Sequence, residues 1–375
     1  MMKKSMLCLL ASLLGASIRL SGCGTGAEAT TAATEAESAA GAGTGTPAET
    51  TAPSGTAEAS KASPSAASLN EGPKITCQAA IRVGSLKGPT SMGLVSLMDK
   101  AGKGGTSNVY EFTMAGKADE LVGKIANGDL DIALVPANVA SVLYNKTEGN
   151  VTVLDINTLG VLYVVASDDS ITSMADLKGR TICMTGKGTT PEYVMNYLLK
   201  ENGLSTSDVD LQFKSEATEV VSMLKQDSSA IGVLPQPFAT AACIQNEALK
   251  PVLDLTEQWT LLNKDSKSML VTGVTLVRSD FLRENQAPVA DFLKDHEDST
   301  AFTAEHPDEA AELIAAQGIV EKPPIAKKAL PYCNIVCMTG QEMKDALSGY
   351  LSVLQAQDAK SIGGQLPGDD FYYMP

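Results

Sequence analysis

An internal repeat constrains the fold of this chain more than any other feature of its sequence. The segment "LKGPTSMGLVSLM" aligns with "GKGTTPEYVMNYL", and Lys87 falls on Lys187 at a spacing of 100 residues. A second pair, "ADELVGKIANGDLDIALVPANVAS" and "ATEVVSMLKQDSSAIGVLPQPFAT", places Pro136 on Pro235 at a spacing of 99 residues. Self-similarity at a fixed period indicates duplicated structural units. The sequence therefore predicts two related units with the same order of elements.

Each copy has the pattern of an α/β unit. The runs "DIALV" and "AIGVL" are short and apolar and precede helical patterns, as expected of parallel strands covered on both faces. In the second copy Thr190 is placed to cap a helix, Pro191 takes the first helical position, and Gly203 ends the helix. Since ligands bind at the carboxyl ends of strands in open parallel sheets, each unit directs its loops at a ligand-sized space.

Two such units facing each other would place four loops around one cleft: residues 86–91, 136–138, 185–192 and 235–237. The first loop, "LKGPTSMG", has a Lys, two Gly and hydroxyls but lacks the G-x-x-x-x-G-K-[ST] order of a phosphate loop. A hydroxyl-rich turn that opens a helix leaves backbone N–H groups free to receive an anion. The alternative is that Thr90 or Ser91 only caps the helix.

Two apolar segments, 159–167 and 269–279, are suited to carry the chain between the units and back. We therefore expect an α/β fold with a discontinuous first lobe, 75–166 plus 272–375, and a continuous second lobe, 167–271. Two crossings make a hinge. The alternative is that both segments are edge strands of one large sheet.

The N-terminal residues 1–23 have the features of a signal peptide, with Lys3 and Lys4 before an apolar stretch that ends in "LSGC". This ending resembles the bacterial lipobox, in which Cys23 is lipidated and anchors the protein outside the cell membrane. The alternative is a cleaved signal without a lipid. Residues 24–74 are mostly Ala, Thr, Ser, Gly, Glu and Pro, which cannot form a core. They predict a disordered tether, typical of a Gram-positive surface.

Composition excludes some classes of protein. The net charge of −15 argues against a nucleic-acid partner. Without Cys8 and Cys23, five of the seven cysteines remain, and an odd number in apolar runs is no disulfide framework. Cys333 and Cys337 lack C-x-x-C spacing, so we interpret them as buried small hydrophobic residues.

The chain resembles the solute-binding lipoproteins of ABC importers, in particular the nitrate, sulfonate and taurine group that also includes binders of thiamine pyrimidine precursors. The resemblance covers about residues 76–375 and rests on the lipobox, the tether, "DLKGRTI", "TTPEY", "NGDLDIALVP" and "HPDEAAELI". It implies a type II periplasmic-binding-protein fold, an ABC permease as partner, a monomer without a cofactor, and a small anionic organic solute. The alternatives are a thiamine-related pyrimidine as solute, or a pyrimidine-synthase-like enzyme on the same fold.

The resemblance also implies which residues contact the solute, because family ligands touch the strand-to-helix loops of both lobes. Tyr193 and Phe238 are candidate aromatic walls, with ordinary helix packing as the alternative. The full set of expected ligand-binding residues is Lys87, Gly88, Pro89, Thr90, Ser91, Pro136, Ala137, Asn138, Lys187, Gly188, Thr189, Thr190, Tyr193 and Gln236.

Catalysis has few candidate residues in this sequence. The two histidines, His296 and His306, lie in an acidic helical region away from the four loops. No Ser-His-Asp or Cys-His arrangement, H-E-x-x-H motif or metal-ligand pattern is visible. Lys87 or Lys187 as a Schiff-base lysine is the remaining route, and a positive charge facing an anion is the simpler interpretation. We therefore expect a binding protein and not an enzyme, with an extracellular sensor or adhesin as a third class.

Overall fold

The computed structural model describes residues 80–375. The predicted signal peptide, the lipidation of Cys23 and the tether lie outside the described residues. No helix in the described part of the chain is both long and apolar enough to cross a membrane.

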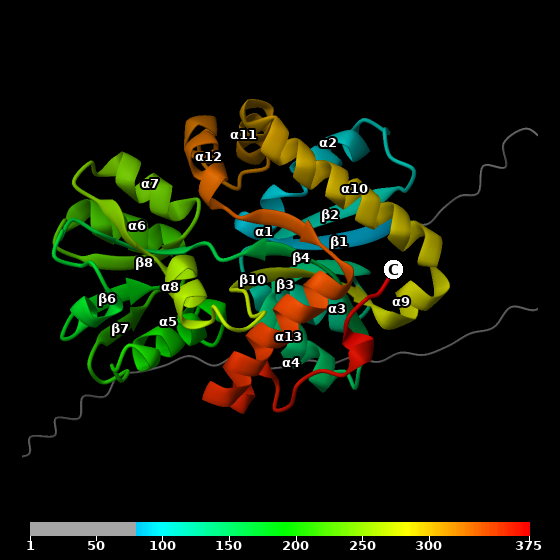
Figure 1. Ribbon diagram of the computed structural model, residues 1–375. Helices are drawn as coiled ribbons and strands as arrows, with labels where there is room; N and C mark the ends of the chain where they lie inside the picture. Colours follow the sequence, from blue (N-terminus) through cyan, green and yellow to red (C-terminus); the bar gives the residue numbers. More distant parts are fainter. Residues whose placement is uncertain (1–79) are drawn as a thin grey trace, which may run out of the picture. The chain divides into compact units, whose positions relative to one another are not determined.

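Two separate β-sheets organise the described residues (Figure 1). The first has the order β11-β4-β10-β3-β1-β2 and consists of β1 (Ile81–Leu86), β2 (Tyr110–Ala115), β3 (Ile132–Pro136), β4 (Val151–Leu159), β10 (Val271–Arg278) and β11 (Ile335–Met338). The second has the order β7-β6-β8-β5-β9 and consists of β5 (Leu162–Ala166), β6 (Thr181–Met184), β7 (Asp210–Phe213), β8 (Ile231–Pro235) and β9 (Lys250–Asp254).

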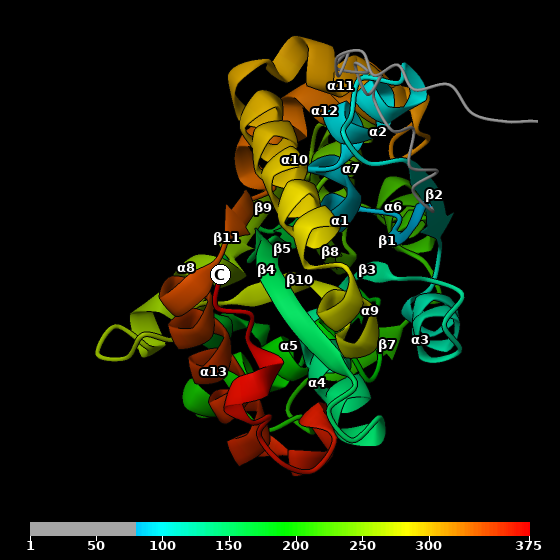
Figure 2. The same ribbon diagram turned by 90° about the vertical axis from the view of Figure 1, so that its right-hand side faces the viewer.

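Helices connect and cover the strands of both sheets (Figures 1 and 2). The α-helices are α1 (Pro89–Met92), α2 (Val95–Gly102), α3 (Ala118–Ala126), α4 (Ala137–Lys146), α5 (Thr190–Glu201), α6 (Ala217–Gln226), α7 (Phe238–Gln245), α8 (Leu255–Leu262), α9 (Ser279–Glu284), α10 (Gln286–Glu305), α11 (Pro307–Ala316), α12 (Pro323–Ala329) and α13 (Gly340–Gln357). Short 3₁₀ turns are η1 (Met174–Leu177), η2 (Leu330–Tyr332), η3 (Ala359–Ile362) and η4 (Asp369–Phe371).

The duplication predicted from the sequence is visible in the strand order. In the first sheet β2, β1 and β3 are adjacent and parallel, and an antiparallel strand, β10, follows β3. In the second sheet β7, β6 and β8 are adjacent and parallel, and an antiparallel strand, β5, follows β8. The predicted α/β fold of two lobes is confirmed, and one large sheet with edge strands is excluded.

The strand β3 shows why both faces of the first sheet are covered. Ile132 and Leu134 pack into a buried cluster with residues of α2 and α10. Ala133 and Val135 point the other way, into a cluster with residues of α3, α4 and α13. Figure 2 shows α10 on one side of the strands and α4 and α13 on the other. Burial on both faces explains the continuous apolar run in the sequence.

The chain crosses between the sheets twice, and the first crossing lies within the segment 159–167 that was expected to carry it. The first lobe was expected to run to residue 166. Gly160 and Val161 interrupt this segment, and β5 pairs antiparallel with β8 and β9 of the second sheet. A Cβ on Gly160 would collide with Thr256 Oγ1, so the tight crossing requires a glycine there. The return crossing leads into β10, which pairs with β3 and β4 of the first sheet.

Candidate functional site

The four predicted loops lie at the carboxyl ends of four parallel strands. Residues 87–88 connect β1 to α1, and β3 runs directly into α4. Residues 185–189 connect β6 to α5, and residues 236–237 connect β8 to α7. Since β1 neighbours β3 and β6 neighbours β8, the two loops of each lobe lie at one sheet edge. This is the place where open α/β sheets bind ligands.

The first loop turns at Gly88. This residue has φ 148° and ψ −154°, a backbone conformation open almost only to glycine, and no atom lies within 4 Å of the position its Cβ would take. Lys87 is exposed and Pro89 is half-buried. Gly88 itself is buried, so the turn presents one exposed side chain, the cation of Lys87.

The hydroxyl groups of this loop serve the local structure. Thr90 Oγ1 and Ser91 Oγ both donate to the carbonyl oxygen of Leu86, at 2.9 and 2.6 Å. Ser91 also shares a 2.5 Å hydrogen bond with Ser85. Both side chains are buried, and the residue at the N-cap of α1 is Gly88. The alternative that Thr90 or Ser91 caps the helix was wrong, because their hydroxyls point back to the end of β1.

The corresponding loop of the second lobe carries an acidic group at the start of α5. The backbone N–H of Gly188 donates to Glu192 Oε2 at 2.5 Å. Gly188 is exposed, has φ 74°, and has no atom within 4 Å of a Cβ position. The N-cap is Thr189 instead of the predicted Thr190, and its hydroxyl donates to Gly186 O at 2.8 Å. A carboxylate at a helix N-terminus is favourable because of the partial positive charge there.

Lys187 is exposed, and its ammonium lies 5.8 Å from the centroid of the Phe213 ring. At this distance the cation is attracted by the ring face. The side chain thus leans toward β7 at the rim of the loop. An exposed pair of this kind is weak, so Lys187 is free to turn to an anion.

The two lobes meet through a buried polar cluster between the second and third loops. Asn138 Nδ2 donates to Gly188 O at 3.5 Å and to Ser361 O at 3.1 Å. Thr190 Oγ1 donates to Asn138 Oδ1 at 3.4 Å, and Tyr350 OH donates to Thr190 Oγ1 at 3.3 Å. Asn138 and Thr190 are both almost fully buried. These two predicted site residues are brought together, in an arrangement that joins α4, α5 and α13.

The remaining predicted residues take structural positions near the loops. Gln236 is buried, and its Oε1 accepts hydrogen bonds from the backbone N–H and the hydroxyl of Thr240, at 3.2 and 2.8 Å. Pro136 is the N-cap of α4 and Ala137 is buried. Tyr193 is half-buried against the core of α5, and burial raises the pKa of its hydroxyl. The side-chain carbonyl oxygen of Gln236 therefore holds the first turn of α7 through Thr240.

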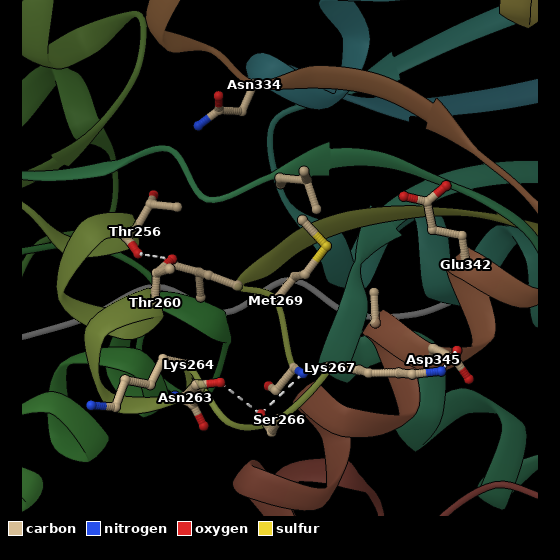
Figure 3. Close-up of a pocket in the computed structure, with 14 residues that line it drawn as sticks. Thr256, Thr260, Asn263, Lys264, Ser266, Lys267, Met269, Asn334, Glu342 and Asp345 are labelled. Atoms are coloured by element: carbon tan, nitrogen blue, oxygen red, sulfur yellow. Dashed lines mark hydrogen bonds and ion pairs between the residues drawn. The ribbon is translucent and has the colours of Figure 1, made fainter.

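A cavity of about 680 Å³ lies at the crossings and not at the four loops. Figure 3 shows it between Thr256 and Thr260 of α8, Met269 of the return crossing, and Glu342 and Asp345 of α13. Lys267 forms an ion pair with Asp345 across its rim. None of the predicted ligand-binding residues lines it. Residues of both lobes therefore form its walls.

One cluster of reactive side chains was not predicted from the sequence. His296 of α10 lies with Asp155 of β4 and Cys337 of β11, and both partners face the same ring nitrogen, Nδ1. A catalytic relay needs its acid and its nucleophile on opposite ring nitrogens. Burial raises the pKa of the Cys337 thiol, which disfavours the nucleophilic thiolate. The arrangement is therefore unsuited to nucleophilic catalysis.

Comparison with family models identifies the class of this chain. Residues 104–321, more than half of the chain, match the family model described as ABC transporter, phosphonate, periplasmic substrate-binding protein. A search of curated proteins gave no match.

Solved structures share the fold at low sequence identity. An ABC transporter protein from Parabacteroides distasonis matches with a TM-score of 0.65 and 22% identity, covering 79% of this chain and 98% of that chain. The periplasmic aliphatic sulphonate binding protein SsuA from Escherichia coli matches with a TM-score of 0.64 and 15% identity, covering 79% and 92%. The alkanesulfonate-binding protein SsuA from Xanthomonas axonopodis pv. citri, bound to MOPS, matches with a TM-score of 0.55 and 13% identity, covering 78% and 96%.

The family match, the duplicated α/β lobes and the strand-end loops lead to one conclusion. This chain belongs to the phosphonate-type family of periplasmic substrate-binding proteins of ABC transporters.

Proposed function

We propose that this chain captures a small organic solute with an anionic group, of the phosphonate or sulfonate class, between its two lobes and delivers it to an ABC permease. The observation that carries the proposal is the repeated loop. At equivalent strand ends, Lys87 precedes Gly88 and Lys187 precedes Gly188, and both glycines have positive φ and open space at the Cβ position. Backbone N–H groups beside a cation suit an oxyanion.

The neighbouring α4 and α5 support the same kind of solute. The helix α4 has 10 residues and follows β3, and α5 has 12 residues and follows β6. The N-terminus of each helix carries partial positive charge. Asn138, on the first turn of α4, contacts Gly188 of the opposite lobe. An anion held between these loops would therefore be contacted by both lobes.

A second candidate is a solute with a hydrogen-bond donor or a cationic group, such as a thiamine-related pyrimidine. Glu192 favours it, because this carboxylate occupies the Gly188 N–H group and places a negative charge at the loop. The half-buried ring of Tyr193, one residue further on, supplies an aromatic surface. The two candidates differ in the sign of charge that the loop accepts.

A thermal-shift screen of alkylphosphonates, alkylsulfonates, taurine, nitrate and thiamine-related pyrimidines tests the proposal. We expect stabilisation by a phosphonate or sulfonate, followed by calorimetric titration of that solute. A charge-assisted hydrogen bond contributes about 1.5–3 kcal/mol, so Lys87→Ala combined with Lys187→Ala should weaken binding at least about tenfold. Both lysines are exposed, so the double variant should keep its fold.

Lys200→Ala, which removes an exposed cation at the other end of α5, is the matched control and should bind like the parent. Stabilisation by pyrimidines alone, undiminished in the double variant, would refute the anionic solute and support the second candidate. Thr190 is left unchanged in these variants, because its hydroxyl contacts Asn138 and Tyr350. Its loss would change the stability of the protein as well as its affinity for the solute.

We also propose that Cys23 carries a lipid that anchors the protein to the outer face of the cell membrane, as "LSGC" and the Ala- and Thr-rich segment after it suggest. Cys23→Ala should then release the protein into the medium or leave it with an uncleaved signal. Detergent partitioning measures this, and equal retention of the variant and the parent in the membrane fraction would contradict lipidation.

A further inference from the structure

Three potential metal ligands from distant parts of the chain lie close together in the first lobe. Asp155 lies on β4, His296 on α10 and Cys337 on β11. Asp155 Oδ2 is 3.2 Å from His296 Nδ1, and Cys337 Sγ is 4.0 Å from the same nitrogen. One ligand atom from each residue lies within 4.8 Å of both others. No other group of three such side chains is found among residues 80–375.

Because these groups are buried, the negative charge of the Asp155 carboxylate needs a positive partner. The side chains of Asp155 and His296 are fully buried, and Cys337 is half-buried. Asp155 accepts hydrogen bonds from only two side chains, His296 and Thr275. A carboxylate has about four acceptor positions, and a buried charge is costly unless it is paired. A divalent cation bound by this carboxylate, a thiolate and a neutral imidazole would leave the cluster with no net charge.

The alternative partner for Asp155 is an imidazolium ion at His296. It would carry a proton on both ring nitrogens, and His296 Nε2 is buried with no hydrogen-bond partner. The hydroxyl of Thr300, one helical turn further along α10, is also buried and unpaired. Both atoms lie close to the position of a Cβ on Gly93, at 3.6 and 3.0 Å. A neutral ring that binds a cation through Nδ1 would also carry a proton on Nε2, and Thr300 is placed to accept it in either case after a small rotation, so the metal titration distinguishes the two partners.

The distances between the three ligand atoms match those of a tetrahedral metal site after small shifts. With Zn²⁺ bonds of about 2.0–2.3 Å, tetrahedral geometry requires about 3.3 Å between N and O ligands and about 3.6 Å between N and S ligands. The nitrogen-to-oxygen distance of 3.2 Å already agrees, and the nitrogen-to-sulfur distance of 4.0 Å needs a closure of a few tenths of an ångström. Thr275 Oγ1, which donates to Asp155 Oδ1 at 2.9 Å, holds the carboxylate with Oδ2 toward the ring.

We propose that Asp155, His296 and Cys337 form a binding site for one divalent cation of the Zn²⁺ type, with a solvent molecule as fourth ligand on the accessible side of Cys337. The mixed oxygen, nitrogen and sulfur set selects a borderline-soft metal over Mg²⁺ or Ca²⁺. Binding forms the sulfur-to-metal bond and releases the thiol proton to solvent. The cation would tie the edge strand β11, which pairs with β4 only at Ile335 and Met338, to the centre of the sheet.

Cobalt is the probe that reports the sulfur ligand directly. The full chain, stripped with a chelator, is titrated with Co²⁺ and then with Zn²⁺. We expect a thiolate-to-cobalt charge-transfer band that saturates at one equivalent and is bleached by Zn²⁺. At Zn²⁺ concentrations about 100 times Kd the melting temperature should rise by about 5 °C.

Matched variants locate the site. Cys337→Ser should abolish the cobalt band and weaken Zn²⁺ binding at least about 100-fold, whereas Cys333→Ser, which changes a buried thiol four residues away, should bind like the parent. Thr300→Val should weaken binding about 10- to 100-fold, as loss of a group that orients a ligand does. No cobalt band, or an equal band in Cys337→Ser, would overturn the proposal. Circular dichroism of each variant before titration shows that the comparison is made on folded protein.

Discussion

The carboxylate of Glu192 should weaken the binding of an anionic solute, and its removal tests how the second-lobe loop binds that solute. Its Oε2 accepts the Gly188 N–H at 2.5 Å, so an anionic solute must displace it before using that donor. A hydrogen bond to a charged group is stronger by about 1 kcal/mol than one to a neutral group. Two like charges about 4 Å apart at an exposed position repel by about 1 kcal/mol. Glu192→Gln should therefore strengthen binding by about 2 kcal/mol, a Kd about 30-fold lower.

Isothermal titration with the phosphonate or sulfonate found in the screen measures this change. The matched control is Glu201→Gln, which makes the same charge change at the last residue of α5, where the residue is exposed. The control should alter Kd less than about twofold at 0.15 M salt, because exposed charges are screened beyond about 8 Å. An unchanged or higher Kd for Glu192→Gln would refute the reasoning and would favour a solute that donates a hydrogen bond to this carboxylate.

Two further substitutions test the crossing and an acidic cap. Gly160→Ala places a methyl group against Thr256 Oγ1 and within 2.9 Å of a Leu270 methyl, so it should cost about 1–3 kcal/mol, with a melting temperature lower by several degrees in calorimetry. Gly116→Ala, where no atom lies within 4 Å, should leave it nearly unchanged, and equal effects of the two would contradict this account of the crossing. Hydrogen bonds from the backbone of Thr172 and from Ser173 lower the pKa of Asp176, so its contribution is present above the ordinary carboxyl pKa of about 3.9 and is lost as the pH falls further. Asp176→Asn should thus melt earlier than the parent at pH 7 with a difference that shrinks below about pH 4, and a difference constant with pH would contradict it.

The local patterns of the sequence were enough to predict the order of elements and the two sheets. The predicted strand "DIALV", residues 131–135, became β3 at Ile132–Pro136, and the helix predicted from Pro191 to the turn at Gly203 became α5. These predictions succeeded because period, caps and glycines act over a few residues. The duplication added long-range information, since it required the two units to share a strand order.

Features set by distant contacts could not be predicted in this way. The hydroxyls of Thr90 and Ser91 had an equally good local partner in Leu86 O, so their residue type did not show where they point. Asp155 and His296 are 141 residues apart, and no spacing rule connects them. The crossing lies at Gly160 because Thr256 of α8 leaves no room for a side chain there. In each case tertiary packing chose between alternatives that local chemistry left equal.

Closure of the two lobes on a solute can be measured by small-angle X-ray scattering. Two crossings connect the lobes, and Asn138 of one lobe hydrogen-bonds Gly188 and Thr190 of the other. Scattering curves should be recorded on the protein alone and on the protein saturated, as shown by calorimetry, with the solute from the screen. The account predicts a smaller radius of gyration for the saturated protein, because binding proteins of this architecture close by hinge motion. Superimposable curves at full saturation would contradict it.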